Sequence, residues 1–166
     1  MRPEDISKTY AVRRLTEHDL PAILALCRTN PLFYKHCPPN VTEDSIRADM
    51  QALPPGKTPK DKYYLGYFDG NRLAAVLDLI LGFPNEETAF IGFFMVDAAL
   101  QGRGVGSALV EELCCHLKSC GFAAVRLGWV QGNPQSEHFW HKNNFKENGA
   151  RSKNDTYTIL YAQRGL

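Results

Sequence analysis

The sequence predicts one α/β domain with a mixed, mostly antiparallel central sheet, a β-α-β unit and flanking helices. Two apolar runs, 62–68 and 72–81, are joined by the tight-turn sequence DGN, which favours an antiparallel hairpin. The clearest helix, 104–119, lies between the apolar runs 89–96 and 123–130, and a helical crossover of this kind joins parallel strands. No repeat or linker divides the 166 residues, so we expect the whole chain to form this domain.

The first part of the chain is expected to hold one strand and two helices. The alternating run 10–15 favours a strand, and Thr16 begins a capping-box-like start to a helix that extends to about Arg28. The next segment contains three prolines and is expected to interrupt that helix. Thr42 then caps a second helix that extends to about Leu53.

The second half of the chain carries the β-α-β unit and a closing hairpin. From Val105 onward the central helix has an apolar residue at every fourth position, and Gly121 lies just past its end as a C-cap. A shorter helix is predicted for 134–142. The runs 145–149 and 156–162 are predicted as two antiparallel strands around a polar turn.

Three glycines stand at alternate positions where the central helix begins. Gly102, Gly104 and Gly106 allow a turn in which several backbone N–H groups converge at a helix N-terminus, which favours binding of an anion. Arg103 adds a positive charge beside them. The alternative is a glycine-rich turn with no ligand, although one glycine would suffice for a turn.

Two common nucleotide-binding motifs do not fit these glycines. A P-loop requires a lysine that is absent here. A dinucleotide fingerprint beginning at Gly102 would need glycine or alanine where Ser107 stands. It would also need an acidic residue at the end of the next strand, where the sequence has Gln131.

The composition argues against nucleic acid and membrane as partners. The formal net charge is +1, which gives no strong field, and the apolar runs are too short and interrupted to span a bilayer. Five cysteines without a C-x-x-C pair, and no apolar segment near the N-terminus, are typical of a cytoplasmic protein with free thiols. His138 and His141 share a helix but lack a third ligand, so no metal site is expected.

Two sequence blocks resemble the GCN5-related N-acetyltransferase (GNAT) superfamily. The first, QGRGVG from Gln101 to Gly106, is similar to the family's signature Gln/Arg-x-x-Gly-x-Gly/Ala at the start of the central helix. The second, NPQSEHFWHKNNF from Asn133 to Phe145, resembles the asparagine, small residue, aromatic pair and terminal phenylalanine that follow the family's fifth strand. The predicted order of elements also agrees with the family fold over nearly the whole chain.

The resemblance implies acetyl-CoA as cosubstrate and a direct attack of a neutral amine on its acetyl group. The glycine turn would hold the pyrophosphate, the strand near Phe94 would pair with the pantetheine arm, Asn133 would hydrogen-bond that arm, and Trp140 would flank the thioester. The residues that the resemblance assigns to acetyl-CoA binding are Phe94, Met95, Val96, Gln101, Gly102, Arg103, Gly104, Val105, Gly106, Ser107, Asn133, Ser136 and Trp140.

The catalytic groups are less evident. Many family members place a tyrosine where Trp140 stands, and an indole N–H cannot supply the proton that a phenol can, so no general acid is assigned. Asp78 stands inside the apolar run 72–81, where a buried carboxylate could receive the substrate ammonium or act as a base. The alternative is that Asp78 faces outward or finds a polar partner at a sheet edge. The alternation of side chains along the strand does not decide on which face Asp78 lies.

The acceptor is expected to be a primary amine, on a small molecule or a peptide. Phe33 and Tyr34 lie where the family forms one wall of its acceptor groove, and the alternative for this pair is packing between helices. The resemblance also makes a homodimer possible. The competing function is a non-catalytic acyl-CoA-binding or regulatory domain, which the tryptophan at position 140 and the lack of an evident base favour.

Overall fold

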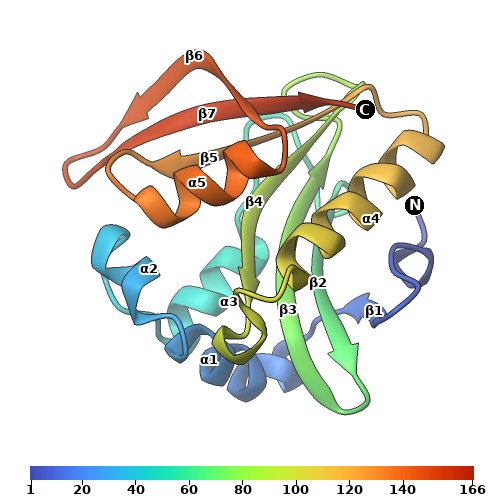
Figure 1. Cartoon of the computed structure of the whole chain (residues 1–166), viewed down its shortest axis with the longest axis vertical. Coiled ribbons are helices and arrows are strands. Elements are labelled where there is room, and N and C mark those ends of the chain that lie inside the picture. The colour runs from blue at the N-terminus through green and yellow to red at the C-terminus, as the bar shows by residue number, and fades with distance from the viewer.

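A computed structural model describes all residues, 1–166, and places seven strands in one sheet of order β1-β2-β3-β4-β5-β7-β6 (Figure 1). Only β4 and β5 are parallel, and every other neighbouring pair is antiparallel. The predicted fold class and its β-α-β unit are therefore confirmed. The strands are β1 (Ala11–Arg14), β2 (Lys62–Asp69), β3 (Arg72–Leu81), β4 (Thr88–Val96), β5 (Ala124–Val130), β6 (Lys146–Lys153) and β7 (Thr158–Gly165).

The helices differ from the prediction near the N-terminus. A 3₁₀ turn, Glu17–Asp19, immediately precedes the first α-helix, and the Thr16 N–H donates to Asp19 Oδ2 at 2.8 Å. The segment predicted to be a break contains a further short helix, because Pro31 stands at its first position, where proline is tolerated. The helices are α1 (Leu20–Arg28), α2 (Pro31–His36), α3 (Glu43–Gln51), α4 (Val105–Ser119) and α5 (Pro134–Lys142).

The closing hairpin is longer than its sequence pattern predicts. β6 runs on to Lys153 and β7 to Gly165, with an irregularity in their pairing between Glu147 and Arg151. Nearly every residue of β6 is exposed. An exposed edge strand needs no apolar alternation, so its sequence carries little sign of its length.

The two faces of the sheet are covered by different helices. On one face α4 and α5 pack over a core that includes Leu109, Leu113 and Trp140. On the other face α1 and α3 pack over a smaller core that includes Ile23 and Ile46. Figure 1 shows α4 on the opposite side of the sheet from α1 and α3.

The two parallel strands separate part-way along their length. β4 pairs with β5 only from Thr88 to Ile91, and a bulge at Gly92 interrupts the pairing of β4 with β3 at the same level. β5 continues to Val130 beside β7 instead. The sheet therefore has a V-shaped opening beyond Ile91 that connects its two faces.

No helix of the chain is long and apolar enough to cross a lipid bilayer. All five cysteines are free thiols.

Candidate active site

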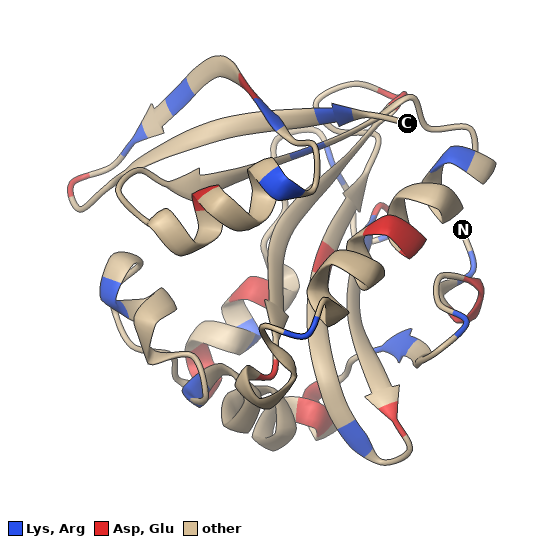
Figure 2. Cartoon of the chain, in the orientation of Figure 1, with Lys and Arg blue, Asp and Glu red and all other residues tan.

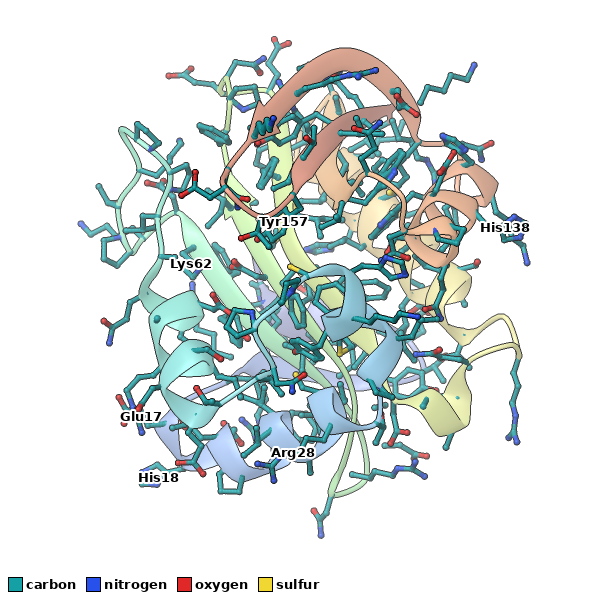
Figure 3. The ribbon with its side chains drawn as sticks, turned by 90° about the vertical axis from the view of Figure 1, so that its left-hand side faces the viewer. Glu17, His18, Arg28, Lys62, His138 and Tyr157 are labelled. Carbon is teal, nitrogen blue, oxygen red and sulfur yellow. The ribbon has the colours of Figure 1, made fainter.

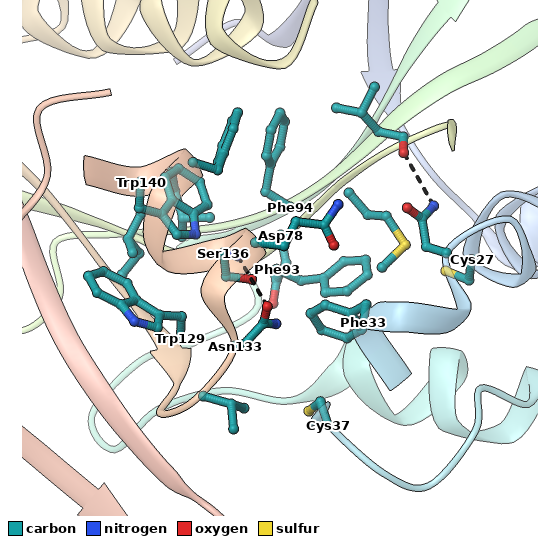
Figure 4. Close-up of a pocket in the computed structure, with 18 of the residues that line it drawn as sticks. Cys27, Phe33, Cys37, Asp78, Phe93, Phe94, Trp129, Asn133, Ser136 and Trp140 are labelled. Atoms are coloured by element: carbon teal, nitrogen blue, oxygen red, sulfur yellow. Dashed lines mark hydrogen bonds between the residues drawn. The ribbon is translucent and has the colours of Figure 1, made fainter. Parts of the chain in front are cut away.

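A groove of about 840 Å³ occupies the V-shaped opening and reaches both faces of the sheet (Figure 4). We name its two ends by the residues that form them. The glycine-turn end is formed by Phe94, Val96, Gln101, Gly102, Gly104, Gly106, Ser107, Asn133, Ser136, Phe139 and Trp140. The carboxylate end is formed by Cys27, Phe33, Tyr34, Cys37, Val41, Ile46, Asp49, Tyr64, Asp78, Phe93 and Tyr157.

The glycine turn leaves helix donors free for a ligand. Gly104 is the N-cap of α4 with φ +81°, and Gly102 has φ +73°, a region that favours glycine. A glycine N-cap has no side chain that could accept from the first helical amides. The first intrahelical donor is Ala108, which donates to Gly104 O at 3.0 Å, so the N–H groups of Val105, Gly106 and Ser107 have no intrahelical partner.

The third glycine serves packing. A Cβ at Gly106 would lie 3.1 Å from a ring carbon of Phe139, so the absence of a side chain allows α4 to approach α5 closely. At Gly102 and Gly104, a Cβ would meet no atom within 4 Å, so the backbone there is open to the groove. This geometry fits an anion at the helix N-terminus.

Gln101 fixes the turn to the end of β4. Its Nε2 donates to Val96 O at 2.8 Å and to Asn30 Oδ1 at 2.5 Å. Asn30 Nδ2 also donates to Val96 O at 3.2 Å, so the carbonyl of Val96 is already satisfied. The side chain of Gln101 therefore holds the link between α1 and α2, the end of β4 and the glycine turn together.

The free edge of β4 presents alternate backbone groups to the opening. The Asp97 N–H donates to Ala74 O in β3 at 2.9 Å. By the alternation of an antiparallel ladder, the polar groups of Met95 also point to β3, while those of Phe94 and Val96 point into the opening. With the Val96 carbonyl engaged, the free groups are the Val96 N–H and both groups of Phe94.

The aromatic side chains at the glycine-turn end form one cluster. Trp140 is 7% exposed, and its ring centroid lies 4.8 Å from Phe139, 5.2 Å from Phe145 and 5.9 Å from Phe94. The Trp140 indole N–H donates no hydrogen bond within the protein. Asn133 caps α5 by accepting from the Ser136 N–H at 3.2 Å, which leaves its Nδ2 free at the groove wall (Figure 4).

Asp78 is buried on the face of the sheet that α1 and α3 cover, as its neighbour Val76 in the smaller core indicates. Lys62, also buried, donates from Nζ to Asp78 Oδ2 at 2.8 Å and lies 2.7 Å from Oδ1. Burial raises the pKa of Asp78 to about 6, although the hydrogen bond and charge of Lys62 act to lower it. Of the alternatives left by the sequence, the inward-facing carboxylate is correct.

The bulge at Gly92 makes room for this carboxylate. A Cβ at Gly92 would lie 2.7 Å from Asp78 Oδ2, and both residues line the groove. Asp78 Oδ1 has no contact with solvent. Any proton that Asp78 takes from the groove must therefore arrive at Oδ2.

Asp49 is the second carboxylate at this end, and it has no ion pair or hydrogen bond within the protein. It lies on α3 on the groove wall, and its side chain is exposed to solvent. Desolvation by the surrounding protein raises its pKa, and the charge of Lys62 acts to lower it. Burial raises the pKa of the nearby Tyr34 and Tyr64 phenols far above the usual range, and the charge of Asp49 adds to this.

Most residues that the resemblance assigned to the site line this one groove, but Arg103 and Val105 do not. Arg103 is exposed on the turn, and the Val105 side chain packs against the larger core, so only its N–H is available. Phe33 lines the groove and also packs edge-on against Tyr34 at 5.0 Å and Phe93 at 5.7 Å between ring centroids. Phe33 therefore lines the groove and also packs against its aromatic neighbours, so the two alternatives for this residue are compatible.

The sequence analysis missed Lys62, Asp49, Tyr64 and Tyr157. Figure 3 shows Lys62 and Tyr157 well away from His138, which lies at the outer edge of α5. In the structure Tyr64 lies opposite Asp78 and Lys62 lies two residues away on the same face, but this pairing depends on a bulge in β2 that the sequence does not reveal. No group of three or more His, Cys, Asp or Glu side chains could hold a metal ion.

Comparison with known families decides the relationship. The family model described as "Acetyltransferase (GNAT) family" matches residues 25–145, which include both sequence blocks and most of the groove. The chain belongs to the GNAT family of acetyltransferases. Acetyl transfer with acetyl-CoA as donor is therefore its reaction class. A comparison with curated protein sequences gives no match.

Solved structures of GNAT acetyltransferases have the same fold. An acetyltransferase from Thermus thermophilus is 22% identical with a TM-score of 0.76, over 95% of this chain and 97% of that one. The Escherichia coli ribosomal-protein-S18-alanine N-acetyltransferase is 17% identical with a TM-score of 0.65, over 93% and 92%. RimL, a ribosomal L7/L12 alpha-N-protein acetyltransferase solved with coenzyme A, is 19% identical with a TM-score of 0.72, over 97% and 96%.

Proposed function

We propose that this GNAT protein is an acetyl-CoA-dependent N-acetyltransferase that transfers the acetyl group directly to a primary amine while both substrates are bound. The observation that supports this proposal most strongly is the continuity of the groove. One opening through the sheet joins a helix N-terminus with free amides to a buried carboxylate on the opposite face.

The glycine-turn end fits the donor substrate. The free amides of Val105, Gly106 and Ser107 would hold the pyrophosphate, since a helix N-terminus favours negative charge. The Phe94 carbonyl and the Val96 N–H would pair with the amides of the pantetheine arm, and Asn133 Nδ2 would donate to it. Because the Met95 groups point to β3, this residue contributes to the wall only.

The carboxylate end would handle the amine proton. The amine nitrogen attacks the acetyl carbon, a C–N bond forms, the C–S bond breaks, and the electron pair of that bond stays on sulfur. Asp78 Oδ2 would take the amine proton, directly or through one water, because a carboxylate with a pKa of about 6 is ionised at neutral pH and still basic enough to accept it. The Phe94 N–H would stabilise the negative charge that develops on the acetyl oxygen.

The leaving thiolate would receive its proton from water. Trp140 flanks this position with a free indole N–H, which can hydrogen-bond a thiolate but cannot protonate it. A thiolate is a stable leaving group near neutral pH, since thiol pKa values are around 8.5. The reaction therefore needs no general acid from the protein.

A non-catalytic acyl-CoA-binding domain is the second candidate, and the tryptophan at position 140 favours it. Release of free CoA thiol from acetyl-CoA, measured with a panel of primary amines, separates the two functions. The enzyme is expected to release thiol only when an accepted amine is present. Tight acetyl-CoA binding without thiol release for any amine or peptide would support the binding domain.

A further inference from the structure

The carboxylate end carries an unbalanced negative charge. Asp49 and Asp78 line this end, and the only cation close to them is Lys62. Lys62 Nζ is held by Asp78 and by Ala52 O at 2.9 Å, and it forms no ion pair with Asp49. The neighbouring phenols of Tyr34 and Tyr64 stay neutral, so one negative charge at Asp49 has no counter-ion in the protein.

The reactive amine cannot supply that counter-ion throughout the reaction. It must be neutral when it attacks, and the amide that it becomes is also neutral. A cation that stays paired with Asp49 from binding to product release must therefore be a second charged group on the acceptor. The unpaired carboxylate on the groove wall indicates where this group would lie.

The rest of the lining also limits the acceptor. The groove has no arginine, and its one lysine, Lys142, comes from α5 on the other face of the sheet. Figure 2 shows acidic positions on α3 and no charged position along β4. An acceptor carboxylate would find no free cation near Asp49. The carboxylate end is also lined by apolar side chains, among them Phe33, Phe93 and Ile46, which suit a methylene chain.

We propose that the acceptor is an α,ω-diamine, with the reacting amine near Asp78 and the second ammonium paired with Asp49. This inference rests on the proposed N-acetyltransferase function and names its substrate class. It also makes Asp49, which contacts no reacting atom, the residue that selects dications over single amines.

The test compares amines that differ only at the far end. Putrescine, cadaverine and hexamethylenediamine are each paired with the monoamine of the same chain length, and γ-aminobutyrate and an alanine-initiated peptide complete the set. Thiol release is expected to give the highest kcat/KM for one of the diamines and the lowest for γ-aminobutyrate. Equal kcat/KM for each diamine and its monoamine, or acceptance of the peptide alone, would overturn the proposal.

The variant Asp49→Asn then tests the residue itself. The change is expected to raise KM for the preferred diamine by about fivefold, because it removes the exposed carboxylate that pairs with the second ammonium. KM for the matched monoamine should rise much less than KM for the diamine. An equal loss for diamine and monoamine would assign Asp49 a structural role instead.

Asp44→Asn is the matched control. Asp44 lies on the same helix, outside the groove, in an exposed pair with Arg47 at 2.7 Å. Asp44→Asn removes the same charge as Asp49→Asn. An equal rise in KM for the diamine in both variants would show that a long-range field acts on the diamine, not a contact with Asp49. Melting curves check folding, and Asp49→Asn is expected to melt no lower than wild type because it loses no ion pair.

Binding separates this inference from the proposed function. If no amine releases thiol, the proposed function fails, and the diamine site is then tested by calorimetric titration of the CoA-bound protein. Binding of a diamine but not its monoamine, weakened by Asp49→Asn, would retain the site. No binding of any diamine would remove it.

Discussion

The two ends of the groove recognise their ligands by different means. At the glycine-turn end the working groups belong to the backbone: the first amides of α4 and the free edge of β4. At the carboxylate end they belong to the side chains of Asp49, Asp78 and Lys62, brought from α3, β3 and β2. Backbone N–H donors do not titrate, whereas the carboxylate end depends on the ionisation of its side chains.

This difference explains how a family can keep acetyl-CoA as its acetyl donor while the amines that accept the acetyl group vary. A backbone site depends on turn conformation, so few residue types satisfy it and its sequence is recognisable. A side-chain site on covering helices can change by single substitutions without disturbing the sheet. We therefore expect variants at the two ends to have separable effects on donor binding and on turnover.

The largest effect is expected at the glycine turn. Gly104→Asp would place a carboxylate beside the pyrophosphate and should weaken acetyl-CoA binding by about a thousandfold or more, since like charges in contact cost several kcal/mol. Calorimetry on the folded variant provides the measurement. Gly56→Asp is the control, because Gly56 has nearly the same φ, +79°, with open space around it and lies outside the groove. Equal affinities for Gly104→Asp and wild type would remove the phosphate site.

The next effect is expected at Asp78. Asp78→Asn should lower kcat by a factor of about 10²–10⁴ if Asp78 is the base, with acetyl-CoA affinity retained. The wild-type kcat/KM should fall as the pH drops through about 6, because protonated Asp78 cannot accept a proton, and the variant should lack this limb. An unchanged pH profile and kcat in the variant would leave Asp78 with a structural role.

The same variant is expected to destabilise the fold. Asp78→Asn leaves the buried Lys62 ammonium without its counter-ion, which is costly. This cost cannot be predicted from the sequence alone, because the pairing of Lys62 with Asp78 is evident only in the structure. The double variant Lys62→Met with Asp78→Asn should recover thermal stability but not turnover, and recovery of both would contradict the role of Asp78 as base.

The smallest effect is expected at Trp140. Its indole N–H can contribute one neutral hydrogen bond to the leaving sulfur, worth about 1 kcal/mol, so Trp140→Phe should lower kcat by roughly fivefold. Trp140→Tyr should keep or raise kcat by offering a phenol. A loss of several orders of magnitude in both variants, with CoA binding retained, would show that the indole is essential.

The sequence signals for the glycine-turn end are local. Alternate glycines, the spacing of apolar residues in α4 and the block after β5 each lie within one element. The carboxylate end depends on how β2, β3 and β4 are paired, and one bulge in each of the two pairings shifts the register. Starting from Asp69 opposite Arg72, unbroken pairing would place Tyr63 opposite Asp78, but the bulge after Tyr67 places Tyr64 there.

Gly92 was a usable signal for the second bulge. A glycine inside an otherwise apolar strand often marks a bulge or a close approach, and here it accommodates the Asp78 carboxylate. Asp49 had no such signal. It lies on a largely polar helix among other acidic residues, and only the packing of α3 over the groove distinguishes it from Asp44.

The central claim is that both ends act together, so that the acetyl group passes directly from donor to amine. Initial rates measured over a grid of acetyl-CoA and amine concentrations test it most directly. The account predicts intersecting double-reciprocal lines and no acetylated protein by intact mass after incubation with acetyl-CoA alone. Parallel lines, together with an acetyl group on Cys27 or Cys37, the two thiols that line the groove, would contradict it.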